Sequence, residues 1–530
     1  MAVTSLSTLA LFAPILVIGS LAWRIIHSLY FHPLSKFHGP WYAASFSIVH
    51  ALASALKVEH EWLLQLAKRY GASKPIRIAP NLLLFPQPSA VKEIYWDSKL
   101  NTKGLFYGSG ALGPPHLFTT LDGDQHKELR KAIGGPHYTI GTLKNHWEPR
   151  FDDLILTALE KWTEKSERGE TIQLCDKVAE FAADVMTMVS FSEPWGFVRN
   201  DRDERELLKR WRDSLPYFGF VNRFRWFRDV VMKSSWGVYF LPSSSDNTGM
   251  GFFMREADRQ VTIREYRMKN EQYSQECPDF LQHCLEARIG TKPLSPVQKR
   301  AHITLLFQAG ADTTGTALGC TFRFLVTNPD VMSRCQAEID AADQAGKLSS
   351  PIVQYEETRT HLPLVVACIR ESLRLHPPAP TLFPRIVPRV GGGGLGAKKT
   401  SSSGGFKTIG DVVLPPGFEI TTHPYVVQRD PVLYAPDPEV FRPERWLEAS
   451  PEKLSEMEAG QFTFGVGPRV CLGKDVAYME LYKLIPQVLR TFDMDLQRPG
   501  QFVVAGGVAF NNDFAVKLRV RKRGETFMHD

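Results

Sequence analysis

The chain has 530 residues, of which 43% are hydrophobic and 23% are charged. This composition is typical of a folded globular protein, so it excludes a chain that is disordered throughout. The net charge of +6 is small for this length and gives no reason to expect nucleic acid as a partner. The length allows several domains, but no linker-like segment divides the chain and no internal repeat is present.

Residues 1–23 carry no charged side chain and are rich in Leu, Ala, Ile and Val. The segment is long enough to cross a bilayer as a helix of roughly 20 residues, so we expect a transmembrane anchor. A cleaved secretory signal is the alternative, because Ser20-Leu21-Ala22 is an acceptable cleavage site. No basic residue precedes the apolar run, whereas Arg24 and Lys36 follow it. That charge distribution favours an anchor with the rest of the chain, residues 41–530, in the cytosol.

The seven cysteines form no Cys-x-x-Cys pair and show no spacing typical of a zinc site. Their number is odd, which favours reduced thiols in a cytosol-facing protein over a disulfide framework.

Residues 24–40 contain Pro33, Gly39 and Pro40, which interrupt any continuation of the first helix. We expect a stiff hinge here between the anchor and the globular part, with an ordinary loop as the alternative. Two short apolar runs separated by Ala79-Pro80-Asn81 then predict a β-hairpin, over residues 76–78 and 82–85. Helical periodicity dominates the next part of the chain, over residues 125–133, 147–167, 178–189 and 201–213.

The segment 217–239 alternates aromatic residues with Arg223, Arg225 and Arg228. A helix of this kind can lie on a membrane, with arginines at the lipid headgroups and rings below them. The alternative is a core helix with a solvated arginine face, and the pattern alone does not separate the two.

Ser295-Pro296-Val297-Gln298 has the residues of a helix start, and the helical pattern continues to Asn328. At 1.5 Å per residue such a helix would be close to 50 Å long. Its middle, residues 309–315, contains two glycines, two threonines and Asp312, which are poor helix formers. We expect the helix to open locally there and to form a groove. Small residues that allow a close helix crossing are the alternative.

Glu371 and Arg374 are three residues apart in a predicted helix over 364–375, so they can pair on one face. Residues 391–405 are rich in glycine and serine and predict a flexible loop. Leu414-Pro415-Pro416-Gly417 predicts a turn before another strand. Residues 502–520 alternate as in a final hairpin.

A single cysteine, Cys471, ends the glycine-containing loop Phe464-Gly465-Val466-Gly467-Pro468-Arg469-Val470-Cys471-Leu472-Gly473. An amphipathic helix is predicted to follow, with Pro486 kinking or shortening it. The first amides of that helix would face the sulfur and lower the thiol pKa. The glycines allow the backbone to lie close against a flat object, and Arg469 could hold an anionic group on that object. A buried cysteine near a turn is the alternative.

These features together resemble a cytochrome P450 of the membrane-anchored fungal type, and the resemblance extends from the anchor to the final hairpin. The loop from Phe464 to Gly473 is similar to the family's haem-binding signature. Residues 309–314 resemble its oxygen-activation motif. Glu371, Arg374 and Arg445 match its salt-bridge triad. Departures are the long glycine-rich insertion, Trp446 where phenylalanine is commoner, and His126 in place of a frequent tryptophan.

The resemblance implies a mainly α fold with small β-sheets and a haem b group whose iron is bound by the Cys471 thiolate. Asp312 and Thr313 would deliver protons, and Glu371, Arg374 and Arg445 would form a structural network. Binding of the haem, including its propionates, is implied for Phe464, Gly465, Gly467, Gly473, His126, Arg130, Arg385 and Arg469.

The implied activity is a monooxygenase that inserts one atom of O2 into a lipophilic small molecule, as fungal relatives do when they tailor terpenoids, polyketides or alkaloids. Electrons would come from NADPH through a separate membrane-bound reductase. The implied location is the endoplasmic reticulum membrane, with a single span in the bilayer. Two alternatives remain: a haem-thiolate isomerase or dehydratase, and a membrane-tethered haem-binding protein without catalysis.

Overall fold

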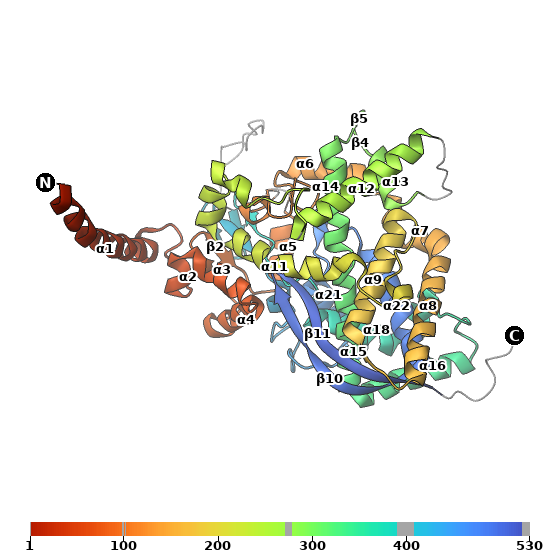
Figure 1. The fold of residues 1–530 in the computed structure, drawn as a ribbon. Coiled ribbons are helices and arrows are strands. Elements are labelled where there is room, and N and C mark those ends of the chain that lie inside the picture. Colours follow the sequence, from red (N-terminus) through yellow and green to blue (C-terminus); the bar gives the residue numbers. More distant parts are fainter. Residues whose placement is uncertain are drawn as a thin grey trace.

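The computed structural model describes residues 2–97, 100, 102–247, 249–270, 278–388 and 407–521, and it is mainly helical with small sheets (Figure 1). The helices are α1 Ala2–Ile26, α2 Trp41–Ser45, α3 Ser47–Ala55, α4 Glu59–Tyr70, α5 Ser89–Tyr95, α6 Gly123–Ile133, α7 Ile140–Thr142, α8 Glu148–Glu167, α9 Leu174–Phe191, α10 Phe197–Asn200, α11 Leu207–Arg223, α12 Gly249–Lys269, α13 Phe280–Glu286, α14 Pro296–Ala309, α15 Asp312–Thr327, α16 Pro329–Gln344, α17 Tyr355–His361, α18 Pro363–Leu375, α19 Pro424–Val427, α20 Arg445–Glu448, α21 Pro451–Gly460 and α22 Lys474–Thr491. The predicted mainly α class with small sheets is confirmed.

The strands form small sheets from segments that are distant in the sequence. They are β1 Ile76–Ala79, β2 Leu82–Leu84, β3 Thr171–Gln173, β4 Arg288–Ile289, β5 Lys292–Pro293, β6 Arg385–Ile386, β7 Lys407–Ile409, β8 Val412–Leu414, β9 Glu419–Thr421, β10 Phe492–Ala505 and β11 Val508–Val520. One sheet has the order β1-β2-β9-β6 and another β10-β11-β3, while β4-β5 and β7-β8 are two-stranded. In the first sheet, β2 pairs in parallel with β9, from Leu82 opposite Glu419 to Leu84 opposite Thr421.

The largest hydrophobic cluster joins α8, α9, α15, α16, α18 and α22 to the final hairpin β10–β11, which lies in front of α15 in Figure 1. A second cluster joins the segment before α6 to α9, α11, α12, α13 and α14. Helix α15 contributes to the first cluster and α14 to the second, so the junction between these two helices lies where the two clusters meet.

The chain leaves α1 through a segment that is fixed to the globular part. The Nε–H of Arg24 donates to the carbonyl of Ser45 at 3.0 Å, and Arg77 Nη1–H donates to the carbonyl of Ser28 at 2.8 Å. Gly39 lies so close to β1 that a Cβ atom there would be 2.2 Å from the carbonyl oxygen of Arg77. Helix α1 itself extends away from the body of the protein (Figure 1).

Helix α11 is attached to the N-terminal layer by a buried ion pair. The guanidinium of Arg223 pairs with both carboxylate oxygens of Glu59, and His50 Nε2 lies 2.5 Å from Glu59 Oε1. All three side chains are at most 3% exposed. The link joins α3 and α4 to the C-terminal end of α11.

Several predicted helix boundaries are wrong. Residues 201–206 contain no α-helix: Asp201, Arg205 and Glu206 have positive φ, and only a 3₁₀ turn is present, at Glu204–Glu206. The Asp203 carboxylate accepts the amides of Leu208 and Lys209 at the start of α11. The segment 217–239 is not one helix. Its first part belongs to α11, and a π-helical turn at Phe227–Val231 and a 3₁₀ turn at Ser235–Tyr239 follow.

Pro486 does not shorten α22, which continues to Thr491. Proline cannot donate to the carbonyl four residues earlier, which belongs to Tyr482. The hydroxyl of Thr358 in α17 donates to that carbonyl instead, at 2.6 Å. The final hairpin is confirmed, but it begins at Phe492, earlier than predicted. The predicted flexible loop at 391–405 lies outside the described residues.

Candidate active site

Cys471 lies between a 3₁₀ turn at Gly467–Arg469 and the start of α22. Its amide N–H donates to the carbonyl of Phe464 at 2.8 Å, which closes the loop. Gly465 and Gly467 have φ values of 68° and 69°, a region that favours glycine. A Cβ atom on Gly467 would also be 2.8 Å from the carbonyl oxygen of Tyr95. The glycines therefore serve the turn and its close packing on α5.

The Cys471 side chain has solvent-accessible surface, although protein atoms surround it on many sides. Burial raises the pKa of this thiol, and the Gly473 amide, Arg130 and Lys474 oppose that effect only in part. The expected lowering of the thiol pKa by the helix start alone is therefore wrong. A metal ion bound to the sulfur would favour the thiolate, because metal ligation requires the deprotonated form.

The predicted long helix is interrupted at Gly310 and Ala311, between α14 and α15. At this junction Ala309 is exposed although Phe307 and Gln308, which precede it, are buried. The Thr313 hydroxyl donates to the Ala309 carbonyl at 2.8 Å. The predicted local opening is confirmed, and so is the alternative of a close helix crossing, because Gly315 packs on α9, where an added Cβ would be 2.6 Å from Ala179 Cα. The predicted groove stays a prediction.

The Cys471 loop and this junction contact the same hydrophobic cluster. Leu472, the neighbour of Cys471, packs against it, as do Leu305 and Leu306 of α14. The two segments therefore pack on one cluster, while Cys471 and Ala309 themselves keep exposed surface.

Asp312 is buried and ion-paired with Arg212 of α11, a residue that the sequence did not indicate. Arg212 Nε and Nη2 both donate to Asp312 Oδ1, at 3.0 and 2.7 Å. Asp312 Oδ2 has no hydrogen-bond partner in the described structure. Arg212 Nη1 also lies 3.5 Å from Oδ1 of Asp176, whose side chain is 49% exposed. Arg212 therefore connects a buried carboxylate to one at the surface.

Basic groups from four separate segments converge beside the Cys471 loop. Burial and the positive charges of four neighbours together lower the pKa of His126 to about 3; the neighbours are Lys103, Arg469, Arg130 and Arg385. Burial and the positive charges of Arg469, Arg385 and Arg130 also hold the pKa of Lys103 well below its usual range. The structure therefore brings together the four predicted propionate residues and adds Lys103.

This arrangement fits a haem b group. The site offers a thiol as iron ligand, a glycine loop that packs closely, and a set of mutually repelling basic groups that two propionates would neutralise. Lys103 was missed because it is a single basic residue in an ordinary segment, and Arg212 because it is one of several basic residues in a highly charged segment. Their partners are distant in the sequence, so no local pattern marks them.

Glu371, Arg374 and Arg445 form the predicted triad, fully inside the protein. Arg374 binds both carboxylate oxygens of Glu371 at 2.8 Å, and Arg445 Nε donates to Oε1 at 2.9 Å. The indole N–H of Trp446 donates to Oε2 at 2.9 Å. Arg374 also donates to the carbonyls of Gln428 and Pro438. The charges are thus paired and hydrogen-bonded, as buried charges must be.

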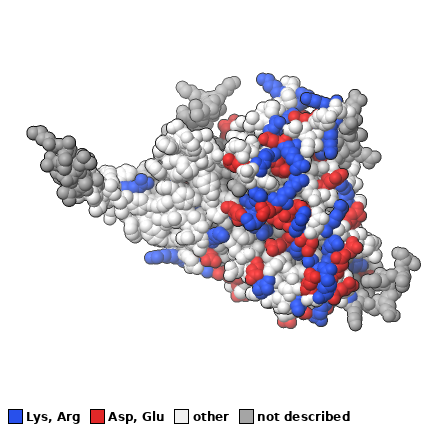
Figure 2. Space-filling model, viewed as in Figure 1, with Lys and Arg blue, Asp and Glu red and all other residues white. Residues whose placement is uncertain are grey.

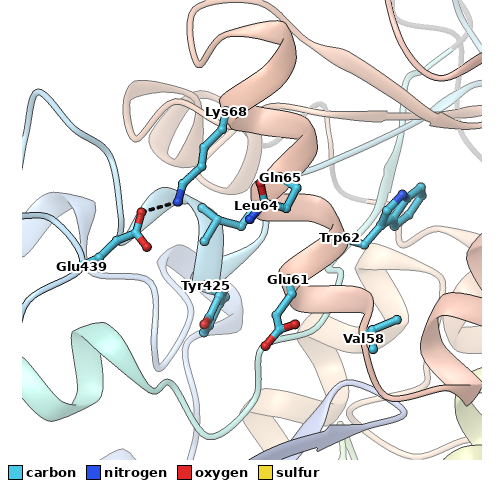
Figure 3. Close-up of a pocket in the computed structure, with 8 residues that line it drawn as sticks. All are labelled: Val58, Glu61, Trp62, Leu64, Gln65, Lys68, Tyr425 and Glu439. Atoms are coloured by element: carbon cyan, nitrogen blue, oxygen red, sulfur yellow. Dashed lines mark ion pairs between the residues drawn. The ribbon is translucent and has the colours of Figure 1, made fainter.

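A surface groove of about 400 Å³ lies elsewhere, between α4 and the segments carrying Tyr425 and Glu439 (Figure 3). An ion pair between Lys68 and Glu439 lies at one end, and Trp62 points away from that end. The groove shares no lining residue with the Cys471 loop, the helix junction or the basic cluster. We do not assign the chemistry to it.

Comparison with known proteins agrees with the geometry. The family model for cytochrome P450 matches residues 49–504. The chain is 28% identical to the cytochrome P450 monooxygenase esdpH of Penicillium shearii, over 96% of this chain and 98% of that protein. It is 29% identical to the cytochrome P450 monooxygenase gsfF of Penicillium aethiopicum, over 96% and 97% of the two chains. It is also 28% identical to the cytochrome P450 monooxygenase aba1 of Botryotinia fuckeliana, over 92% of each chain.

The fold, the cysteine loop and the interrupted helix define a haem-thiolate monooxygenase. The chain belongs to the cytochrome P450 family. It therefore uses a haem with a cysteine thiolate as iron ligand, a small-molecule substrate, O2 and a redox partner that supplies electrons.

Proposed function

We propose that this monooxygenase inserts one oxygen atom into a lipophilic small molecule during the tailoring of a fungal secondary metabolite, such as a terpenoid, polyketide or alkaloid. The relatives above are fungal monooxygenases, and the cluster around the helix junction is apolar and rich in aromatic residues. The observation that supports the oxygen chemistry is a set of two contacts at the helix opening. The Thr313 hydroxyl donates to the carbonyl of Ala309, and Arg212 donates to the Asp312 carboxylate.

In this proposal Cys471 is the iron ligand, and the basic cluster holds the propionates. Phe464, Gly465, Gly467 and Gly473 shape the loop that lies against the ring. Bound there, the haem activates O2, and the thiolate donates electron density that favours O–O cleavage. Glu371, Arg374 and Arg445 fix the position of α18 and contact no substrate.

Two protons must reach the reaction site, and the chain provides a route for them. Asp312 Oδ2 is the carboxylate oxygen that Arg212 leaves unpaired, so it takes up the proton from the solvent side. Thr313 Oγ1, on the next residue, holds the proton at the opening of the helix. Arg212 fixes Oδ1 and keeps the buried carboxylate from becoming an unpaired charge.

The electrons are proposed to come from NADPH through a separate membrane-bound reductase. Residues 1–23 anchor the protein in the endoplasmic reticulum membrane, residues 24–40 form the hinge, and the catalytic domain over 41–530 faces the cytosol. Helix α1 supports this proposal, because Pro14–Phe31 is long and apolar enough to span a bilayer.

An exposed apolar surface beside the hinge supports a second membrane contact. We call it the apolar face; its members are Trp41, Tyr42, Leu52, Leu56, Trp226, Val230, Trp236, Val238, Tyr239 and Phe240. Figure 2 shows an uncharged surface next to α1, whereas the more distant part of the same view carries many charged residues. The segment after α11 reaches α3 through the Arg225 amide, which donates to Ser47 Oγ. Apolar surface of this extent is typical of a membrane contact.

Substitution of Thr313 by alanine tests the oxygen chemistry. We expect Thr313→Ala to keep its haem and to consume NADPH and O2, but to release more hydrogen peroxide and less product, because the hydroxyl no longer holds the proton. Thr327→Ala, which removes a comparable hydroxyl at the end of α15, is the matched control. The measurement is the ratio of product to NADPH consumed in microsomes that contain the reductase.

The spectrum of the reduced, carbon monoxide-bound protein tests the ligand. Folded protein whose band lacks the thiolate-specific red shift would remove Cys471 as the iron ligand. Turnover that continued without NADPH and O2 would contradict the monooxygenase function. Candidate pathway intermediates, incubated with the same microsomes and analysed by mass, would identify the substrate class.

A further inference from the structure

A row of four aromatic rings extends from the Cys471 loop to α17. The ring of Phe464 lies 5.1 Å from that of Tyr478, Tyr478 lies 5.4 Å from Tyr482, and Tyr482 lies 5.4 Å from Tyr355, measured between ring centroids. These separations are within the range of direct aromatic contact. Phe464 is also the residue whose carbonyl accepts the Cys471 amide. We call Tyr478, Tyr482 and Tyr355 the tyrosine row.

The tyrosine row begins beside Phe464 of the iron-ligand loop and ends close to the surface. Tyr478 and Tyr482 are one turn apart on α22, and Tyr355 is the first residue of α17. Tyr355 is 9% exposed, and its neighbour Glu356 has a side chain that is 38% exposed. An electron can therefore pass between the loop and the surface through rings in contact.

Charges along the row favour oxidation at its outer end. Near Tyr482 the positive charges of Arg370 and Arg359 lower the phenol pKa, although burial raises it overall. The pKa of Tyr355 is raised to about 12, mainly by burial, with contributions from Tyr482 and the negative charges of Asp475 and Glu356 and with Arg359 opposing them. A phenol that loses an electron becomes positively charged until it releases its proton, and negative charges nearby favour that state.

We propose that the tyrosine row conducts oxidising equivalents out of the haem site when no substrate consumes them. In each event one electron moves from Tyr355 through Tyr482 and Tyr478 to the haem site. The O–H bond of Tyr355 breaks, its proton passes to water at the surface, and a neutral tyrosyl radical remains. A one-electron reductant of the ascorbate or thiol class then returns the electron, and the proton returns from water. The proposal rests on the monooxygenase function, which supplies the oxidant.

The tyrosine row also has a structural effect, because it packs α17 against α22. A purely structural row would not direct a radical to one residue. Substituting phenylalanine for the middle tyrosine retains a ring in contact and removes only the oxidisable hydroxyl, so it separates the two roles.

The test uses the substrate-free holoenzyme, mixed with a peracid in the presence of a nitroso spin trap and digested for peptide mapping by mass. We expect the trap on Tyr355 in the wild type. In Tyr482→Phe we expect the Tyr355 adduct to fall to background, an adduct to remain on Tyr478, and the haem to bleach faster. The control Tyr266→Phe changes an exposed tyrosine of α12 and should leave the Tyr355 adduct unchanged.

An undiminished Tyr355 adduct in Tyr482→Phe would overturn the proposal, as would a wild-type protein in which Tyr355 is never labelled. The carbon monoxide spectrum of every preparation shows whether the haem-thiolate site is formed. A spectrum without the thiolate-specific band would contradict the proposed iron ligand. A normal spectrum combined with either of these two labelling results would contradict the role of the tyrosine row alone.

Discussion

Trp446 completes the set of donors around the Glu371 carboxylate. Its indole N–H joins two arginines and the Arg442 amide, which donates to Glu371 Oε1 at 3.1 Å. Phenylalanine, the commoner residue implied by the family resemblance, has no hydrogen to donate there. This departure from the pattern therefore has a physical reason: the tryptophan satisfies an acceptor position on a buried carboxylate.

We expect Trp446→Phe to lower the free energy of unfolding by about 1–3 kcal/mol, because a hydrogen bond to a buried charged group is lost. Urea denaturation of the haem-loaded protein, followed by the haem absorbance, measures this change. The control Trp226→Phe changes an exposed indole and should change stability by less than about 0.5 kcal/mol. Equal stabilities for the two variants would show that the indole hydrogen bond contributes nothing.

At the residue scale, the sequence reveals groups that belong to a local pattern. Cys471, Thr313 and the Glu371–Arg374 pair are found because short spacings mark them. Arg212 and Lys103 are not, because each gains its role only from burial beside charges brought in by other elements. The thiol pKa was predicted in the wrong direction for the same reason, since burial depends on the whole fold.

A buried ion pair, in addition to close packing, attaches helix α11 to α3 and α4. Burial by itself would raise the pKa of Glu59, but Arg223 and His50 outweigh it and hold that pKa well below its usual range. A carboxyl with a depressed pKa stabilises the folded protein at pH values above its unfolded pKa. That contribution is lost as the pH falls through the folded value.

We expect Glu59→Gln to lower the free energy of unfolding by about 3–5 kcal/mol at pH 7, because Arg223 is left as a buried, poorly compensated charge. The difference from the wild type should shrink as the pH falls below about 4.5, where the unfolded chain already binds the proton. Denaturation midpoints between pH 7 and pH 4 measure it. The control Glu61→Gln, exposed on the same helix, should change little at any pH. A difference that stayed constant with pH would rule out the charge of Glu59 as its source.

At the element scale, helix types are easier to predict than helix ends. The capping box at Ser295 and Gln298 is present as expected, because both partners are local. The continuation of α22 past Pro486 is not predictable from that helix, because the replacement hydrogen bond comes from Thr358 in α17. The start of α11 is set by the Asp203 side chain and by three residues with positive φ.

For the whole molecule, the apolar face predicts membrane binding that does not depend on α1. We expect a protein lacking residues 1–26 to remain partly bound to vesicles of neutral phospholipid. Adding Trp236→Ser and Tyr239→Ser should reduce that binding by about tenfold or more, since burying one large apolar side chain contributes about 1.5–3 kcal/mol. Vesicle flotation measures the bound fraction.

Val432→Ser is the control for this experiment, because Val432 is 79% exposed and follows α19 rather than belonging to the apolar face. A truncated protein that stayed entirely in solution would contradict a membrane contact by the apolar face. If Val432→Ser reduced vesicle binding as much as Trp236→Ser and Tyr239→Ser do together, binding would depend on the exposure of apolar side chains and not on their position in the apolar face.

The overall class was predictable, whereas the way the sheets assemble was not. The hairpin β1–β2 follows from a local alternation, and so does β10–β11. The pairing of β2 with β9 and of β11 with β3 joins segments with no shared local pattern. Arg385 reaches the basic cluster through β6, which pairs with β9 and bridges to Lys103, a residue far away in the sequence. This explains why the propionate site is harder to predict than the iron ligand.

The parallel pairing of β2 with β9 also imposes a delay during biosynthesis, because the two strands are synthesised far apart in time. Leu84 leaves the ribosome more than three hundred residues before its partner Thr421. At about 5–20 residues per second, the apolar β1–β2 hairpin then waits roughly 20 s to one minute for the strand that covers its edge. Throughout that interval a nascent chain carries an unpaired strand edge, which is a site for wrong pairing. Slowed translation between these two strands should therefore increase the demand for chaperones before any haem is bound.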